Sequence, residues 1–229
     1  RLAAGAQQYQ ARILEHCEVR SALSSDEGSV TLSTSLGDLA ADRYVVATGA
    51  DSLATQTLAG VTIPQRSTPG IIVITKPLPR LIQRVIAAPG IHLHQRNDGK
   101  LVIGEQSGAP DNSAHTMRLR GRPTRFPTET TALAHAERML ATTRHYLPAA
   151  AGAEVDEVLI GWRPLPIDGH PVLGTPSASP ASYLAIMHSG ITLAPIVGQL
   201  VTQELLTRTP SPYLSNYRPD RQFSSVQGY

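Results

Sequence analysis

The sequence predicts a mixed α/β fold of the α+β kind, with a largely antiparallel sheet in the middle of the chain and helices on its flanks. β-Branched residues run from Ile71 to Thr75, and Asn97-Asp98-Gly99 is a strong hairpin turn between two further strand-like segments. Apolar residues recur every three or four positions in 128–146 and again from Leu193 onward, as they do in amphipathic helices. Clustered strands followed by helices favour this fold class.

The remaining elements follow from local patterns. Expected helices cover 1–11, 128–146 and the stretch that begins near Ile191. Expected strands cover 12–16, 19–23, 30–34, 44–47, 71–75, 90–95, 101–105, 155–162, 171–174 and 183–187. The run 44–47 is apolar on both faces, which is typical of a strand in the centre of a sheet. Residues 107–127 hold Arg, Gly and Pro without periodicity and are predicted to form a surface loop.

Composition narrows the class of protein. The chain has 229 residues and 20 basic against 18 acidic side chains, a formal net charge of +2, which argues against a nucleic-acid-binding protein. Its apolar runs are only a few residues long, so no transmembrane segment is expected. Cys17 is the single cysteine, which excludes an internal disulfide framework and a cysteine-rich zinc site and fits a reducing compartment. Because the chain opens at Arg1 without a signal segment, we expect that its true start is missing.

Three other kinds of site fit poorly. His92 and His94 lie two apart on one expected strand and point the same way, as metal ligands would. A cupin-type metal site also needs a glutamate four residues on, where this chain has Asp98 inside a turn, so we favour two polar residues on a half-buried strand and expect no metal. The chain contains no Gly-x-Ser-x-Gly elbow for serine hydrolysis. It also contains no Gly-x-Gly-x-x-Gly segment and no phosphate loop.

Three segments carry a signal in combination. They are VVATGADS, a hydrophobic strand ending in a glycine turn; GWRPLPIDGHPVLG, with Arg163 before a proline; and YLAIMHSGITLAP, a strand, a glycine turn and a helix start. In this order they resemble the D-amino-acid oxidase family of FAD-dependent flavoproteins, which includes glycine oxidase, sarcosine oxidase and D-amino-acid dehydrogenases. The resemblance runs to about Phe223 and includes the closing YRPDRQF segment.

The resemblance implies a division of the chain. Residues 1–60 and 170–229 would be the remainder of an FAD-binding domain, and 61–169 a substrate-binding sheet domain. Family members begin with a strand and a dinucleotide fingerprint that holds the FAD pyrophosphate at a helix N-terminus. This chain lacks that segment, so we expect it to be the C-terminal portion of such an enzyme.

The resemblance also assigns residues to the cofactor. The helix that starts after Gly190 would direct roughly +0.5 charge and its unpaired N–H groups at the flavin ring. The glycine could equally be a plain turn into a helix. In the relatives a covalently attached flavin is held by a cysteine at the position of Gly161, so FAD is expected to be non-covalent here. The cofactor-binding residues implied are Val19, Ala47, Thr48, Gly49, Gly161, Ser189, Gly190, Ile191 and Thr192.

For the substrate, the resemblance implies that Arg163 holds an amino-acid carboxylate, for which a guanidinium offers a rigid two-pronged donor. An ion pair between Arg163 and an acid such as Asp168 is the structural alternative. His188 would face the flavin, and His94, Gln95 and Trp162 would line the substrate pocket; Trp162 could instead pack in the core.

The implied function is oxidation of an amine or amino acid by hydride transfer to FAD, giving an imine that hydrolyses. The electrons would pass to oxygen or to a membrane quinone, and the expected location is the cytoplasm, peripheral to the inner membrane if a quinone is used. The alternative is a non-catalytic domain or subunit that needs a partner chain to supply the pyrophosphate site. We expect this chain alone to lose FAD, and to associate with the missing segment or another copy because the strand 44–47 and the helix 193–205 have apolar surface to cover.

Overall fold

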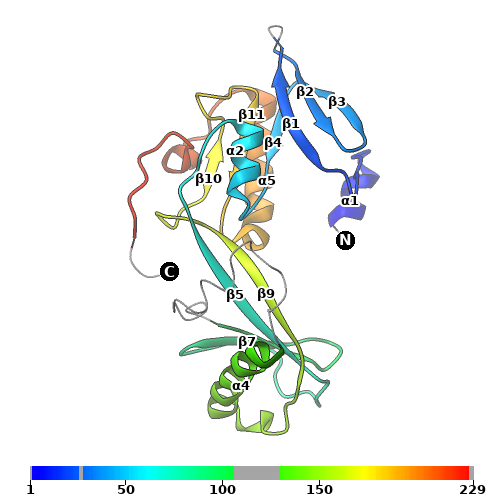
Figure 1. Cartoon of the computed structure of the whole chain (residues 1–229), viewed down its shortest axis with the longest axis vertical. Helices are drawn as coiled ribbons and strands as arrows, with labels where there is room; N and C mark the ends of the chain where they lie inside the picture. The colour runs from blue at the N-terminus through cyan, green and yellow to red at the C-terminus, as the bar shows by residue number, and fades with distance from the viewer. Residues whose placement is uncertain (1, 26–27, 106–128, 227–229) are drawn as a thin grey trace. The chain divides into compact units, whose positions relative to one another are not determined.

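The computed structural model describes residues 2–25, 28–105 and 129–226, without the side chains of 67–69 and 129–131 (Figure 1). The chain forms two compact units. The first comprises Arg1–Gln65 and Pro166–Ser224, and the second comprises Arg66–Leu165 and Ser225–Tyr229. The units change close to the predicted boundaries at 60/61 and 169/170, but which of them binds cofactor and which binds substrate stays a prediction.

The first unit is a mixed α/β structure. Its helices are α1 (Leu2–Gln8), α2 (Ser52–Ala59), α5 (Gly190–Thr207) and the 3₁₀ helix η2 (Pro212–Tyr217). Its strands are β1 (Val19–Ser24), β2 (Val30–Thr34), β3 (Gly37–Ala41), β4 (Tyr44–Val46), β10 (Val172–Gly174) and β11 (Ser182–Ile186). β1, β2 and β3 form an antiparallel sheet, and a second sheet has the order β10-β11-β4. β4 and β11 run parallel, so both strands end at the same edge.

β11 is the centre of this unit, because both of its faces are covered. Tyr183 packs in a cluster with Val197, Leu200 and Val201 of α5. The next residue, Leu184, points to the other face and packs with Val46 and with other residues near α2. The predicted buried strand at 183–187 is therefore confirmed.

β4 differs from its prediction. Val46 is 2% exposed, but its neighbour Val45 is 43% exposed, so only one face of the strand is covered in the described structure. The alternation of side chains along a strand gives the two valines opposite environments.

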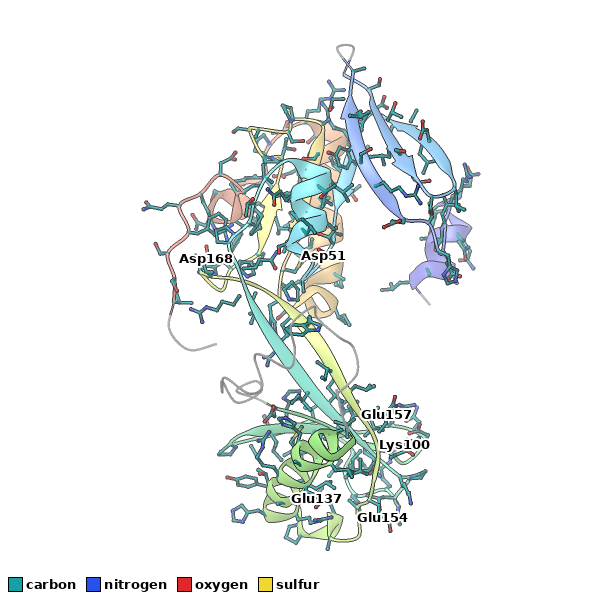
Figure 2. All side chains as sticks on the ribbon, viewed as in Figure 1. Asp51, Lys100, Glu137, Glu154, Glu157 and Asp168 are labelled. Atoms are coloured by element: carbon teal, nitrogen blue, oxygen red, sulfur yellow. The ribbon has the colours of Figure 1, made fainter. Side chains whose placement is uncertain are left out.

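Three further expectations in the first unit need correction. The predicted strand at 12–16 is absent, and His16 has φ 54°, which no extended strand accommodates. The first helix ends at Gln8 instead of residue 11. Helix α2 was not predicted, although the sequence carries its start signal: the side chain of Asp51 (labelled in Figure 2) accepts a hydrogen bond from the Ala54 N–H at 3.0 Å.

The second unit is a sheet with a helix on one face. Its elements are β5 (Gln65–Thr75), β6 (Ile86–Ala88), β7 (Ile91–Gln95), β8 (Leu101–Glu105), α4 (Glu129–Tyr146), the 3₁₀ helix η1 (Pro148–Ala150) and β9 (Val155–Pro166). The strand order is β6-β7-β8-β5-β9, and the pairs β6–β7, β7–β8 and β5–β8 are antiparallel. Gly99, at φ 85°, makes the predicted hairpin turn. The predicted loop 107–127 lies outside the described residues.

The core of the second unit forms between α4 and one face of the sheet. Ala136, Met139 and Leu140 of α4 pack on Val73 and Leu93, which are completely buried. The amphipathic pattern at 128–146 thus gave the right helix. Exposed ion pairs lie elsewhere on this unit, including one of 2.7 Å between Lys76 Nζ and the carboxylate of Glu154, which is labelled in Figure 2. The mixed α/β class with antiparallel sheets is confirmed.

Candidate functional site

The face of the second unit's sheet opposite α4 carries a histidine above a glycine. His92 on β7 pairs with Gly104 on β8, and Gly104 pairs with Ile72 on β5. A Cβ atom at Gly104 would lie 2.4 Å from His92 Nε2, which is far closer than any real contact. The imidazole therefore lies directly on β8, in space that a side chain at position 104 would fill.

Arg163 on β9 lies over a second glycine, Gly70 on β5, as His92 lies over Gly104. A Cβ atom at Gly70 on β5 would lie 3.2 Å from Arg163 Nε. Gly70 shares its sheet face with Ile72 and hence with Gly104, because alternate residues of a strand point the same way. Two glycines thus make room for His92 and Arg163 on one face. Sequence reasoning missed both glycines, although a glycine inside a β-branched strand is the signal for a close approach, and it named His92 only as a polar residue on a half-buried strand.

The electrostatics agree with this proximity. Burial lowers the pKa of His92 below its ordinary 6.5, and the charge of Arg163 and then that of His94 lower it further. Burial also lowers the pKa of Arg163, against the opposing charge of Glu105; a guanidinium nevertheless stays protonated in proteins. The Glu105 side chain is 4% exposed and pairs with Arg138 of α4. At neutral pH this face therefore presents a charged arginine beside an uncharged imidazole.

The predicted pocket residues fall in different places. His94 is exposed on the same face as His92. Trp162 precedes Arg163 on β9, so it points to the other side of that strand and is half-buried.

Gln95 is also on the opposite face and has a structural role. Its Oε1 accepts hydrogen bonds from the N–H groups of Leu81, at 2.7 Å, and Ile82, at 3.2 Å. Its Nε2 donates to the carbonyls of Pro79, at 2.9 Å, and Gly99, at 2.8 Å. A buried amide with all these partners holds the loop that follows β5, so its assignment to the substrate pocket is corrected.

In the first unit, the residues predicted to touch the cofactor, apart from Val19, follow the ends of β4 and β11. Ala47, Thr48 and Gly49 follow β4, and Gly49 has φ 60°, which glycine adopts without strain. The hydroxyl groups of Thr48 and Thr55 lie 2.6 Å apart, which fastens this turn to α2. The positive φ of the turn by itself accounts for a glycine at position 49.

Helix α5 begins at the end of the parallel strand β11, at Gly190. Its N-cap residue Ser189 makes no side-chain capping bond within the described structure, and the first turn of α5 contains no acidic side chain. Ile191 in that turn is 95% exposed. The first N–H groups of a helix have no partner inside it and attract negative charge, so this end can receive an electron-rich group.

Gly190 is not required by the fold. A Cβ atom there would lie 3.8 Å from Met187 Cγ, an ordinary contact, and its φ is not in the left-handed region. The same test at Gly161 on β9 finds nothing within 4 Å. Both positions would accept a side chain, so a glycine there leaves space on the surface.

The other predicted site residues are more peripheral. Val19 begins β1 and pairs with Thr34. His188 is exposed, and its Nδ1 lies 3.4 Å from the Ser189 hydroxyl. Thr192 is exposed in the first turn of α5. The carboxylate of Asp168 binds Arg221, which gives it a partner other than Arg163.

Within the residues that the structure describes, no three His, Cys, Asp or Glu side chains gather to hold an ion. None of the described helices is both long and apolar enough to cross a membrane.

Comparison with known proteins gives the class to which the chain belongs. The profile of the family described as FAD dependent oxidoreductase (DAO) matches residues 1–204. The chain belongs to this D-amino-acid oxidase family, whose members use FAD. The family predicted from the three sequence segments is confirmed.

Individual relatives agree. The chain is 28% identical over 207 residues to glycine oxidase from Pseudomonas putida, covering 87% of this chain and 52% of that protein. It is 29% identical over 207 residues to the bifunctional protein ThiO/ThiG from Synechocystis sp., covering 87% of this chain and 28% of that protein. The chain thus spans about half or less of the curated relatives it matches.

Solved structures show the same fold. Glycine oxidase from Geobacillus kaustophilus superposes with a TM-score of 0.79 at 24% identity, over 97% of this chain and 57% of that one. L-Proline dehydrogenase from P. horikoshii superposes with a TM-score of 0.74 at 22% identity, over 95% of this chain and 56% of that one.

Proposed function

We propose that this chain is part of an FAD-dependent oxidoreductase that oxidises an amine or an amino acid. Glycine oxidase and proline dehydrogenase among its relatives act on amino acids by name. The observation that carries the proposal is the pair of Arg163 and His92 over Gly70 and Gly104, because it places a cation beside an uncharged imidazole on one sheet face. A guanidinium in that position suits a carboxylate.

Arg163 is the residue we assign to the substrate carboxylate. Its side chain lies along β5 over Gly70, which restricts its rotamers and reduces the entropy lost on binding. The neutral imidazole of His92 beside it adds no second positive charge and can donate or accept one hydrogen bond. His94, exposed on the same face, is a further candidate for contact with the substrate.

The N-terminal end of α5 is the part we assign to the cofactor. The uncapped N–H groups, the space at Gly190 and the exposed Ile191 fit a flat, electron-rich ring. We include Ser189 and Thr192 for their hydroxyls, His188 as a neighbour on the same turn, and the turn at Ala47, Thr48 and Gly49. Val19 and Gly161 complete the contacts that we propose for non-covalent FAD.

The chemistry that bound FAD supplies is acceptance of a hydride from the substrate carbon that carries the amine, which leaves an imine for hydrolysis. The chain's own residues bind and orient. Arg163 fixes the carboxylate and thereby the position of the neighbouring carbon, and the helix end offers N–H donors to negative charge that develops during the reaction. Whether oxygen or a quinone takes the electrons is a separate question for the assay.

The test uses the protein expressed from its complete natural reading frame. Protein-bound flavin is measured by absorbance, and a panel of amino acids and their decarboxylated amines is assayed by oxygen uptake and by reduction of a dye. Bound flavin with turnover of at least one substrate supports the proposal, and the acceptor preference separates oxidase from dehydrogenase. Protein without flavin and without turnover contradicts it and supports the alternative of a subunit that acts only with a partner supplying the pyrophosphate site.

A further inference from the structure

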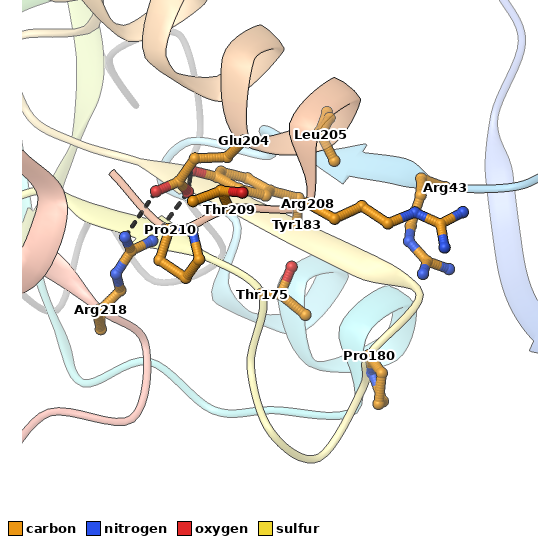
Figure 3. A pocket seen from close by; sticks show the side chains of 10 residues that line it. All are labelled: Arg43, Thr175, Pro180, Tyr183, Glu204, Leu205, Arg208, Thr209, Pro210 and Arg218. Carbon is orange, nitrogen blue, oxygen red and sulfur yellow. Dashed lines mark hydrogen bonds and ion pairs between the residues drawn. The ribbon is translucent and has the colours of Figure 1, made fainter. Parts of the chain in front are cut away.

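A pocket of about 320 Å³ lies in the first unit, at the opposite end of the parallel strands from the proposed flavin site (Figure 3). Arg43 comes directly before β4, and Arg208 directly after α5. Gly49 and Gly190, in contrast, follow the carboxyl ends of β4 and β11. The 18 residues of α5 span about 27 Å at 1.5 Å per residue, so the two places are well separated.

A buried ionic network fixes one wall of this pocket. The two carboxylate oxygens of Glu204 accept hydrogen bonds from Arg218, at 2.6 Å from Nη2 and 2.9 Å from Nη1. The hydroxyl of Tyr183 donates to Glu204 Oε2 at 2.6 Å. The Glu204 side chain is 7% exposed. Because Arg218 is committed to Glu204, the charges of this pair cancel and the wall is rigid.

The other wall holds positive charge that is not cancelled. The side chains of Arg43 and Arg208 extend to the same side of the pocket in Figure 3, and both line it. Neither forms an ion pair with any carboxylate among the described residues. The pocket is thus lined by three arginines against one glutamate, an excess of +2. The hydroxyl of Thr175 also points into it, as Figure 3 shows.

Arg208 occupies its place at a conformational cost. It is the C-cap of α5 and has φ 56°, in the left-handed region where a residue with a Cβ atom is strained and glycine is usual. The left-handed conformation ends α5, because the Arg208 N–H donates to the Glu204 carbonyl at 2.8 Å, and a basic side chain near a helix C-terminus is favourable. The helix end does not account for Arg43, which lies on another element and lines the same pocket.

We propose that this pocket binds a phosphate-type oxyanion between Arg43 and Arg208. Guanidinium groups match the spacing of phosphate oxygens and form charge-assisted hydrogen bonds with them. The pocket has room for a phosphate group and for part of a molecule that carries it. Free phosphate or pyrophosphate and a nucleoside diphosphate share this chemistry. The proposal is independent of the proposed function, because it uses neither Arg163 nor the start of α5.

The test is calorimetric titration of the protein expressed from its complete natural reading frame with inorganic phosphate, pyrophosphate and ADP, at constant ionic strength set with chloride. Saturable binding of at least one probe is expected, weakened roughly tenfold or more in Arg43→Gln and in Arg208→Gly. Arg84→Gln, which changes an exposed arginine of the second unit, is the matched control and should bind as the unchanged chain does. Arg208→Gly should fold at least as well as the unchanged chain, since glycine suits the left-handed cap, so its loss of binding cannot be attributed to unfolding.

The outcomes separate the sources of the anion. Binding of inorganic phosphate or pyrophosphate by itself identifies a free anion, and binding of ADP alone identifies a phosphate carried by a larger molecule. No saturable binding of any probe to the unchanged chain overturns the proposal. Binding that survives both arginine substitutions also overturns it, because the anion then lies elsewhere.

Discussion

Arg221 forms a bidentate ion pair with Asp168, although 53 residues separate them in sequence. Nε donates to Oδ2 at 2.8 Å and Nη2 to Oδ1 at 3.1 Å. The same guanidinium lies 4.3 Å from the centre of the Phe223 ring. This pair fastens the closing segment of the chain to the Asp168-Gly169 turn, and it makes Asp168 a structural residue.

Asp168→Asn should destabilise the first unit. Burial on its own raises the pKa of Asp168, but the hydrogen bonds from Arg221 and the His170 N–H, with the charge of Arg221, outweigh burial and hold the pKa below 3.8. The loss should be roughly 1 to 3 kcal/mol in the free energy of unfolding. Because the folded pKa is the lower one, the contribution is present above pH 3.8 and is lost as the pH falls further. Urea unfolding at pH 7 and pH 3 measures both effects, and an equal cost at the two pH values would count against this account.

Gly104→Ala should displace the His92 ring. The new Cβ atom would lie 2.4 Å from Nε2, at the far end of the exposed His92 side chain, so the imidazole must rotate away from β8. Gly152→Ala is the control, because a Cβ atom there meets nothing within 4 Å. NMR spectra of the His92 ring compare the two variants with the unchanged chain. Unchanged ring signals in Gly104→Ala would show that the histidine does not lie on Gly104.

The pKa of His92 tests the proximity of Arg163. In the unchanged chain, NMR titration of the imidazole should give a midpoint below 6.5, because of burial and then the charge of Arg163. Arg163→Gln removes that charge and should raise the midpoint. Since the folded pKa is the lower one, His92 also makes the folded state lose stability as the pH falls below 6.5. A midpoint that does not change in Arg163→Gln would place the two side chains apart.

Gly190→Ala should lower the amount of bound flavin without lowering the stability of the fold. The methyl group would make an ordinary contact of 3.8 Å with Met187, so stability should be preserved. In the protein expressed from its natural reading frame, however, bound flavin should fall, because the methyl group prevents a close approach to the start of α5. Gly198→Ala, in the same helix with nothing within 4 Å of its Cβ, should keep its flavin. Full flavin content in Gly190→Ala would exclude this helix end from the cofactor site.

Much of the fold could be predicted from local sequence. The amphipathic spacing at 128–146, the turn at Gly99 and the buried strand at 183–187 each depend on neighbours in the chain, and each is present. The strand expected at 12–16 failed because β-compatible side chains cannot compensate for the left-handed backbone at His16. α2 was missed because its start depends on a single capping bond from Asp51.

The candidate site was less predictable, because it depends on pairing between strands. His92 and His94 look alike in sequence, and only the register that sets His92 opposite Gly104 distinguishes them. The sequence does not show that the side-chain amide of Gln95 forms hydrogen bonds with the backbone of the loop at 78–82, which the structure reveals. Arg163 could be named from the family resemblance. A glycine next to a β-branched run signals a close approach, but only the pairing of β5 with β9 shows that Arg163 is the side chain that approaches Gly70.

The role of Arg163 is the central claim and has a direct test. In the protein expressed from its complete natural reading frame, KM is measured for an amino-acid substrate and for the amine that lacks its carboxylate, with Arg163 unchanged and with Arg163→Gln. The account predicts that the substitution raises KM for the amino acid roughly tenfold or more, leaves KM for the amine nearly the same, and preserves the flavin absorbance spectrum. An equal effect on both substrates, or no effect on either, would contradict the assignment of Arg163 to the substrate carboxylate.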